Sequence, residues 1–174
     1  MEKKDLLKDV IKHIDIKSYN STELVDAMRN MSFTSRDTAR AADILMMMCK
    51  EKECTNILTL AGSTSAAGCM QVYVDMVRNK MIDVVVATGA SIIDMDLFEA
   101  LGFKHYIGEK ENVIPDTTLR DLYIDRIYDT YIDEEELQAC DHSTYELANM
   151  LEARPYSSRE FIYEIGKWLH NGKA

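Results

Sequence analysis

Two short turns of small and polar residues are the parts of this sequence best suited to chemistry. Residues 61–68 read Ala-Gly-Ser-Thr-Ser-Ala-Ala-Gly, and residues 88–91 read Thr-Gly-Ala-Ser. Small side chains let a backbone approach a ligand closely, and the hydroxyls of Ser63, Thr64 and Ser65 can hydrogen-bond a phosphate or a ribose. The glycines do not have the spacing of the dinucleotide fingerprint, so close backbone packing is the alternative interpretation of the first turn.

Each turn directly follows an apolar strand. Residues 56–60 read Asn-Ile-Leu-Thr-Leu, and residues 82–87 read Ile-Asp-Val-Val-Val-Ala. The segment between them, residues 69–80, has about the length of a crossover helix, which indicates two parallel strands. Parallel strands end at the same edge of a sheet, so the two turns are expected to lie side by side where such sheets bind nucleotides. The helix after the first turn is expected to begin near Ala66 and to direct its amide groups at the ligand.

Acidic residues and a histidine follow the second turn. Asp94 and Asp96 lie just beyond it, in the first turn of an expected helix. Each carboxylate either interacts favourably with the helix dipole or binds an amine or ribose. The ligand-binding interpretation is stronger for Asp94 than for Asp96. His105 can act as an acid or base near neutral pH, but no serine or cysteine nucleophile accompanies it in the sequence.

The rest of the chain predicts helices and a few short extended segments. Apolar periodicity and capping signals predict helices over residues 35–50, 92–101 and 134–151, the last with a possible restart at 141–143, and a final helix after the Ser157–Glu160 capping box. Residues 103–107 predict a short strand, and 125–132 are ambiguous between a strand and an irregular edge. No further strand follows the last helix, so the predicted sheet has an open edge.

Composition indicates a globular domain with an acidic surface. The chain has 174 residues, 47% of them hydrophobic, and a net charge of −10. Such a charge argues against nucleic acid as a partner. It suits a cationic ligand such as a polyamine, or serves solubility alone.

The four cysteines and the chain's polarity favour a reducing compartment. Cys49, Cys54, Cys69 and Cys140 form no C-x-x-C pair, so they are interpreted as reduced thiols, with neither a metal site nor a disulfide frame. The amino terminus lacks the apolar stretch of a signal peptide, and no run approaches the ~20 apolar residues of a membrane span. The expectation is a cytoplasmic protein without membrane contact.

Four segments, taken in order, resemble the deoxyhypusine synthase family. These are residues 31–36 (Met-Ser-Phe-Thr-Ser-Arg), 58–68, 79–91 and 96–102 (Asp-Leu-Phe-Glu-Ala-Leu-Gly). The resemblance covers nearly the whole chain, but only the amino-terminal half of the family's usual length. It implies that residues 1–174 form a single α/β domain with a Rossmann-like parallel sheet flanked by helices, incomplete relative to the family's full subunit.

The resemblance also implies an activity and a cofactor. The family transfers the aminobutyl group of spermidine to a lysine of a translation factor, using NAD, in tetramers whose active sites form between paired subunits. Asp94 falls where the family carries an acid that touches both cofactor and polyamine, and Ile93 falls where the family has a second acid. The expected NAD-binding residues are Gly62, Ser63, Ala66, Thr88, Gly89 and Ala90 by resemblance, together with Thr64 and Asp94.

Several family residues have no counterpart here. The nucleophilic lysine, the polyamine-binding aspartates and the histidine belong to the family's carboxyl-terminal half, so no residue of this chain is predicted to be catalytic. The first hypothesis is an enzyme half that works with that portion or with a full-length relative, in a homo- or hetero-oligomer. Alternatives are a homospermidine-synthase-like transfer to a small amine, which the Thr-Gly-Ala-Ser turn favours, a non-catalytic paralogue or fragment that binds a full-length relative, and a small nucleotide-binding module.

Overall fold

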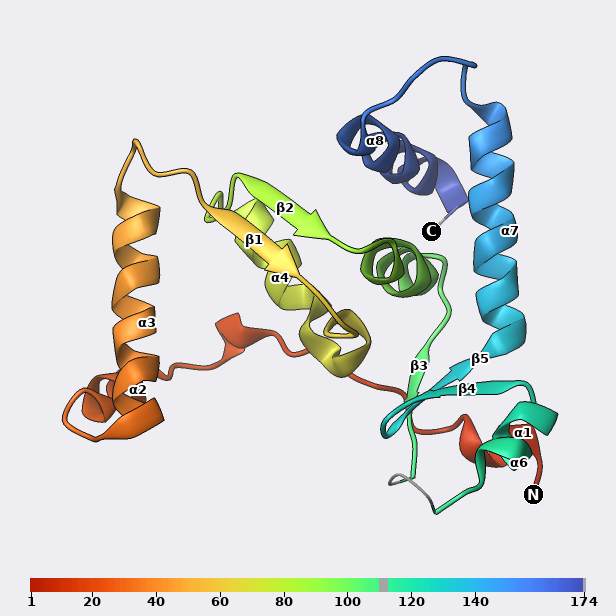
Figure 1. Ribbon diagram of the computed structural model, residues 1–174, viewed down its shortest axis with the longest axis horizontal. Helices are drawn as coiled ribbons and strands as arrows, with labels where there is room; N and C mark the ends of the chain where they lie inside the picture. Colours follow the sequence, from red (N-terminus) through yellow and green to blue (C-terminus); the bar gives the residue numbers. More distant parts are fainter. Residues whose placement is uncertain (110–112, 174) are drawn as a thin grey trace. The chain divides into compact units, whose positions relative to one another are not determined.

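The computed structural model describes residues 1–109 and 113–173, and these form two compact units. Unit 1 comprises residues 1–12, 61–68 and 88–174, and unit 2 comprises residues 13–60 and 69–87. Together they make a mixed α/β chain that is mostly helical, with one small parallel sheet and one small antiparallel sheet (Figure 1).

Unit 2 contains the predicted strand–helix–strand arrangement. Strands β1 (Ile57–Leu60) and β2 (Val84–Ala87) are parallel, with Leu60 opposite Ala87, and helix α4 (Met70–Arg78) connects them in the chain. This confirms the parallel pair expected from the sequence. The other helical elements of unit 2 are the short turn Ile16–Ser18, α2 (Thr22–Met28) and α3 (Phe33–Lys50).

A hydrogen-bond network at Asn56 fixes the start of the parallel pair. The backbone amide of Asn56 donates to Asp83 Oδ2 at 2.8 Å, and its side-chain amide donates to the carbonyl of Met81 at 3.0 Å. Asn56 is itself buried. The residue before β1 therefore holds the segment before β2 in register.

The apolar residues of the parallel pair remain open to solvent. Val84, Val85 and Val86 are 41–55% exposed, and Ile57 is 56% exposed. Parallel sheets normally have both faces covered, so this is an unusual amount of exposed β-branched surface. The apolar side chains of the parallel pair are therefore only partly covered in this structure.

Unit 1 is built around an antiparallel sheet with strand order β3-β5-β4. Its strands are β3 (His105–Ile107), β4 (Ile124–Ile127) and β5 (Thr130–Asp133) (Figure 1). Its helices are α1 (Lys3–Leu6), a wide helical segment Ala90–Leu97 that continues into α5 (Phe98–Ala100), α6 (Asp116–Asp121), α7 (Glu134–Met150) and α8 (Ser158–Trp168), followed by the turn Leu169–Lys173.

This sheet corrects the expectation of a purely parallel sheet. The predicted strand at 103–107 exists as β3, but it pairs antiparallel with β5. The ambiguous segment 125–132 is a β-hairpin, in which Ile127 lies opposite Thr130 across a two-residue turn. A turn this short reverses the chain and requires antiparallel pairing.

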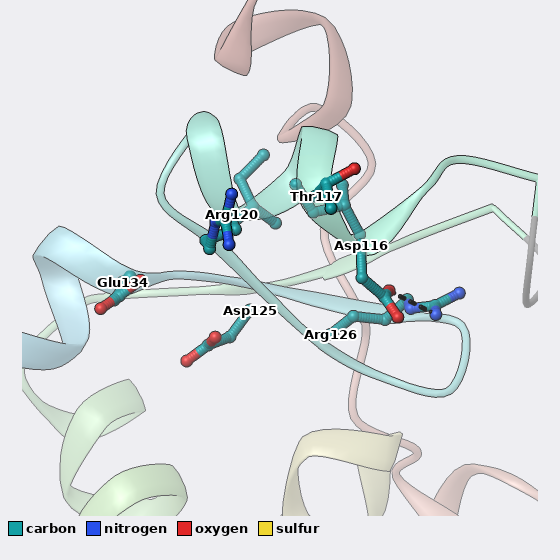
Figure 2. Close-up of a pocket in the computed structure, with 8 residues that line it drawn as sticks. Asp116, Thr117, Arg120, Asp125, Arg126 and Glu134 are labelled. Carbon is teal, nitrogen blue, oxygen red and sulfur yellow. Dashed lines mark hydrogen bonds and ion pairs between the residues drawn. The ribbon is translucent and has the colours of Figure 1, made fainter.

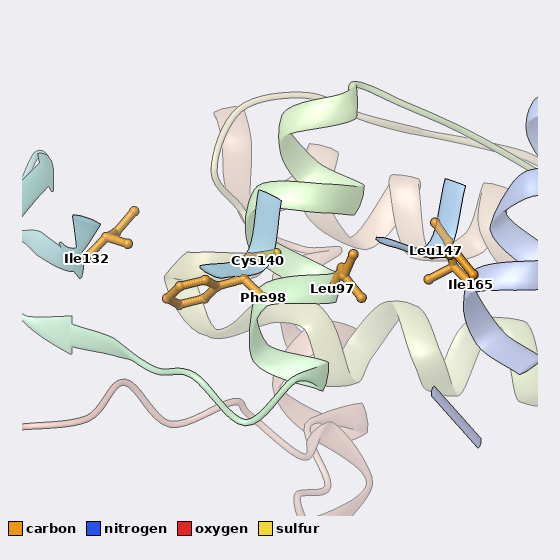
Figure 3. Packing of buried hydrophobic residues seen from close by; sticks show 6 residues of the cluster. All are labelled: Leu97, Phe98, Ile132, Cys140, Leu147 and Ile165. Carbon is orange, nitrogen blue, oxygen red and sulfur yellow. The ribbon is translucent and has the colours of Figure 1, made fainter. Parts of the chain in front are cut away.

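Two apolar clusters hold unit 1 together. The first joins the segment Ala90–Leu97, α5, β5, α7 and α8 through six buried residues (Figure 3): Leu97, Phe98, Ile132, Cys140, Leu147 and Ile165. The second joins α6, β4 and β5 through Ile114, Leu119, Ile124 and Tyr131, with leucines of α1 packed beside it. Both clusters contact β5, which therefore anchors the hairpin to the helices.

Helix ends in unit 1 follow the sequence signals with one exception. The Ser157–Glu160 capping box forms at α8, and Gly102 after α5 has a φ of +102°. Helix α7 begins at the Asp133 cap and continues through residues 141–143, so the possible restart there does not occur. A local cap signal inside a long amphipathic helix does not interrupt it when its apolar face is packed.

Candidate functional site

The two small-residue turns meet in unit 1. The Ser91 hydroxyl donates to the carbonyl oxygen of Gly62 at 3.1 Å, and it lies 3.2 Å from Thr88 Oγ1. Ser91 is buried, so water does not compete for these bonds. The prediction that the turns lie side by side is confirmed, and Ser91 is the residue that joins them.

Glycines determine the backbone path of the first turn. Gly62 has a φ of +71°, and a Cβ built there would meet nothing within 4 Å, so the space beside it is open. Gly68 has a φ of +91°, and a Cβ there would lie 2.9 Å from the carbonyl oxygen of Lys12. Only glycine fits that close approach.

Gly68 also corrects the expected helix start. The segment Ser65–Cys69 is a short helical turn that breaks at Gly68, and α4 begins only at Met70. A left-handed residue cannot continue a right-handed helix. The amino terminus of α4 is therefore separated from Ala66, and any ligand at the first turn meets loop amides and hydroxyls.

A pocket of about 530 Å³ lies beside the first turn, entirely within unit 1. One wall is the first turn, and the other is the tip of the β4–β5 hairpin. Its lining residues are Ala61, Gly62, Ser63, Thr64, Ala66 and Ala67, with Ile127, Tyr128, Asp129 and Thr130 from the hairpin. The sequence predicted the first wall. It did not predict the second wall, because the two-residue hairpin turn contains neither the glycine nor the asparagine that usually marks such a turn.

The structure brings together only part of the predicted site. Gly62, Ser63, Thr64 and Ala66 line the pocket. The Thr88 hydroxyl contacts the Ser91 hydroxyl, which in turn donates to the Gly62 carbonyl of the first turn. The adjacent Gly89 and Ala90 are exposed. None of these three, nor Asp94, lines the pocket.

Asp94 lies in a partly buried, electronegative setting. Burial raises the pKa of its carboxyl group, and the negative charge of Asp141 on α7 raises it further. Neighbouring Cys140 is buried, which raises the pKa of its thiol to about 11 and keeps that thiol neutral at pH 7. Asp94 is thus a carboxylate whose charged form is disfavoured by its surroundings.

His105 is part of the core of unit 1. Its Nδ1 lies 2.6 Å from Glu99 Oε1, and its ring packs 5.0 Å from that of Phe98. The side chain is buried on β3 and does not line the pocket. A structural role explains all of these contacts.

A second, charged pocket of about 410 Å³ lies between α6 and β4 (Figure 2). Arg126 Nη2 lies 2.6 Å from Asp116 Oδ1 across its rim, and Arg120, Asp125 and Glu134 also line it. Its lining therefore combines guanidinium groups with carboxylate groups of opposite charge. No residue singled out from the sequence contributes to it.

Residues 1–109 and 113–173, which the structure describes, contain neither a metal-binding cluster nor a membrane-spanning helix. In that part of the chain, no group of three or more His, Cys, Asp or Glu side chains could hold a metal ion, and the four cysteines are free thiols. No helix in those ranges is long and apolar enough to cross a bilayer.

A family model described as deoxyhypusine synthase matches residues 23–174. The chain belongs to the deoxyhypusine synthase family. It is 64% identical over 173 residues to a deoxyhypusine synthase-like protein of Caulobacter vibrioides, covering 99% of this chain and 47% of that protein. It is 59% identical over 172 residues to a deoxyhypusine synthase-like protein of Coxiella burnetii, covering 99% of this chain and 48% of that one.

A more distant relative comes from an archaeon. A probable deoxyhypusine synthase 2 of Methanosarcina acetivorans is 37% identical over 156 residues, covering 90% of this chain and 44% of that protein. The chain therefore spans about half the length of the curated relatives it matches.

The pocket residues fit the NAD that the deoxyhypusine synthase family generally uses. The open space at Gly62 admits a ligand against the backbone, and Ser63 and Thr64 supply hydroxyls. Between Thr64 and Ala66, the buried Ser65 hydroxyl has no hydrogen-bond partner among the described residues. Among residues 1–109 and 113–173, no lysine or arginine lines this pocket, so its hydroxyls and backbone amides would hold the pyrophosphate.

Proposed function

We propose that this chain supplies an NAD-binding part of a deoxyhypusine-synthase-like transferase. The proposed reaction moves the aminobutyl group of spermidine to a lysine of a protein, with a translation factor as the acceptor. The observation that carries this proposal is the Ser91–Gly62 hydrogen bond, which unites the two turns beside the pocket in a chain that belongs to the family. When bound, NAD would accept a hydride and return it after the transfer, so that the overall reaction is redox-neutral and the rest of spermidine leaves as 1,3-diaminopropane.

The chain's own residues have distinct proposed roles. Ser63 and Thr64 bind the cofactor by hydrogen bonds, while Gly62 and Ala66 leave room for its approach. Thr88, Gly89 and Ala90 form the second cofactor contact. Asp94 attracts the cationic polyamine, and its disfavoured charge gains stabilisation when an ammonium group binds beside it.

The remaining catalytic groups are proposed to come from elsewhere. The region of the relatives that this chain does not cover, or a full-length relative, supplies the nucleophilic lysine and further polyamine contacts. The exposed Val84–Val86 edge of β2 supports this because uncovered parallel strands favour association. The assembly is a homo- or hetero-oligomer in this proposal.

The same exposed sheet favours a second candidate function. In it, the chain binds a full-length relative through β2 and performs no chemistry itself. A transfer to a small amine, as in homospermidine synthesis, is the alternative outcome if catalysis occurs. The two candidates differ in whether NAD reduction depends on residues of this chain.

A mixing experiment tests the proposed function. This chain is combined with a polypeptide covering the rest of the Caulobacter relative. NADH formation with spermidine is followed by absorbance before the acceptor protein is added. The proposal predicts activity only in the mixture, with transfer of the aminobutyl group to the acceptor protein. Asp94→Ala in this chain is expected to abolish turnover.

One result would overturn the role of Asp94, and another would overturn the catalytic proposal. Full turnover with Asp94→Ala removes Asp94 from the site. A stable complex with no NADH under any combination favours the non-catalytic binder. Replacing the acceptor protein with putrescine decides between the two transfer reactions.

A further inference from the structure

The tip of the β4–β5 hairpin has a backbone conformation that its residue type disfavours. Tyr128 has a φ of +54° in the two-residue turn between Ile127 and Thr130. Two-residue hairpins give such positions to glycine, asparagine or aspartate, because a side chain there crowds the following carbonyl. An aromatic side chain at this φ therefore makes the turn strained.

The surrounding contacts hold this strained turn in place. The amide of Gly108 donates to the carbonyl of Asp129 at 2.7 Å, and the amide of Glu109 donates to the Tyr131 hydroxyl at 3.2 Å. Gly108 lies so close to the Tyr131 ring that a Cβ there would be 2.7 Å from it. The hairpin tip is therefore tied to the end of β3.

The ring of Tyr128 is nevertheless held out in the open. The residue is 79% exposed, yet it lines the pocket whose other wall is the first small-residue turn. Burial of the ring does not compensate for the strain. Backbone strain that the native contacts maintain is frequently located at ligand sites.

We infer that Tyr128 is a ligand-binding residue of this pocket, and that its ring stacks on the planar ring of a nucleotide held by the first turn. The inference rests on the proposed NAD site, and it assigns a ligand contact to the hairpin wall of that site. An exposed aromatic face is a suitable platform for a nucleobase-like ring. The neighbouring Asp129 carboxylate, which also lines the pocket, accepts a hydrogen bond from a ribose hydroxyl or a ring amine in this arrangement.

Calorimetric titration of this chain with NAD tests the inference. Tyr128→Ala is expected to weaken NAD binding by roughly tenfold or more, the scale of a lost base–aromatic stack, while Tyr128→Phe keeps the ring and the affinity. Titrations with AMP and with nicotinamide mononucleotide identify which ring is stacked, because only one of them should depend on Tyr128.

Tyr128→Gly separates a ligand-binding role from a structural one. Glycine relieves the left-handed strain, so this variant should unfold at an equal or higher urea concentration while binding NAD more weakly. Tyr123 is a matched control: it has a φ of +56°, is 56% exposed and does not line the pocket. Tyr123→Gly should change stability in the same direction and leave NAD affinity unchanged.

The outcomes distinguish this inference from the proposed function. Unchanged NAD affinity in Tyr128→Ala overturns the role of Tyr128 and leaves the NAD site standing. Tyr128-dependent binding of AMP without binding of NAD supports the inference and overturns the proposed cofactor. No binding of any of the three nucleotides by the unmodified chain overturns both.

Discussion

At the residue scale, Ser91 and Asp94 give the second turn its importance. Ser91 uses its hydroxyl to join the two turns, and its burial protects that bond. Asp94 lies one helical turn further on, where burial and the charge of Asp141 oppose its ionisation. A carboxylate kept in such surroundings is typical of a functional position.

The setting of Asp94 predicts a pH-dependent effect on stability. Its pKa is higher in the folded chain than in the unfolded chain, so its contribution to stability is present at low pH and is lost as pH rises through the folded pKa. Asp94→Asn is therefore expected to raise the free energy of unfolding at pH 7 by up to about 1 kcal/mol, with the gain vanishing below about pH 4. Urea denaturation at both pH values measures this.

Asp141→Asn is the companion variant for that experiment. It removes the opposing charge, so it should also stabilise the chain at pH 7, and the gains of the two variants should not add. A loss of stability in Asp94→Asn at pH 7 would mean that the carboxylate has a favourable partner and would contradict the interpretation.

Sequence reasoning succeeded at residues whose role is local. The Ser157–Glu160 box and Gly102 acted as predicted because a cap depends on a few neighbouring backbone groups. Tyr128 was missed because its contribution to the pocket depends on a hairpin that folds back from a distant part of the chain. No local sequence pattern predicts that a tyrosine will have a positive φ.

At the element scale, Gly68 separates the first turn from α4. A side chain at this position would be strained by the φ of +91° and would press against the Lys12 carbonyl. Gly68→Ala is therefore expected to lower the free energy of unfolding by about 1–3 kcal/mol, measured by urea denaturation. The amino-terminal segment is expected to become less protected from hydrogen exchange.

Gly166 in α8 provides the control. A Cβ there meets nothing within 4 Å, and its φ lies outside the left-handed range, so Gly166→Ala should raise stability by up to about 1 kcal/mol. Equal effects of the two substitutions would contradict the assigned role of Gly68.

The strand elements show what periodicity can and cannot predict. The apolar runs before the two turns predicted β1 and β2 correctly, since each is short, β-branched and bounded by small residues. The antiparallel sheet was missed because β4 is only the four residues Ile-Asp-Arg-Ile and the hairpin turn after it contains neither glycine nor asparagine. The pairing of β3 with β5 depends on tertiary packing and cannot be predicted from either segment alone.

At the scale of the whole molecule, the two units differ in how much apolar surface they bury. Unit 1 has two apolar clusters, whereas the parallel strands of unit 2 leave Ile57 and Val84–Val86 exposed. The chain also spans about half the length of its curated relatives. These facts support the proposal that β2 is an association surface.

Sedimentation of the unmodified chain tests that surface. We expect concentration-dependent association, weakened about tenfold by Val85→Lys, because a lysine on an edge strand opposes further strand pairing. Ile162→Lys on α8, at a similarly exposed apolar position, is the control and should associate like the unmodified chain. Identical behaviour of all three proteins would exclude β2 as the contact.

An amide NMR titration of this chain with NAD tests whether the joined turns and the hairpin tip bind the cofactor. We expect the largest shifts on residues 61–67, 88–91 and 127–130, which form the joined turns and the hairpin wall. Shifts confined to the charged pocket of Asp116, Arg120 and Arg126 would place the nucleotide elsewhere and contradict the account. An unchanged spectrum at saturating NAD would contradict it as well.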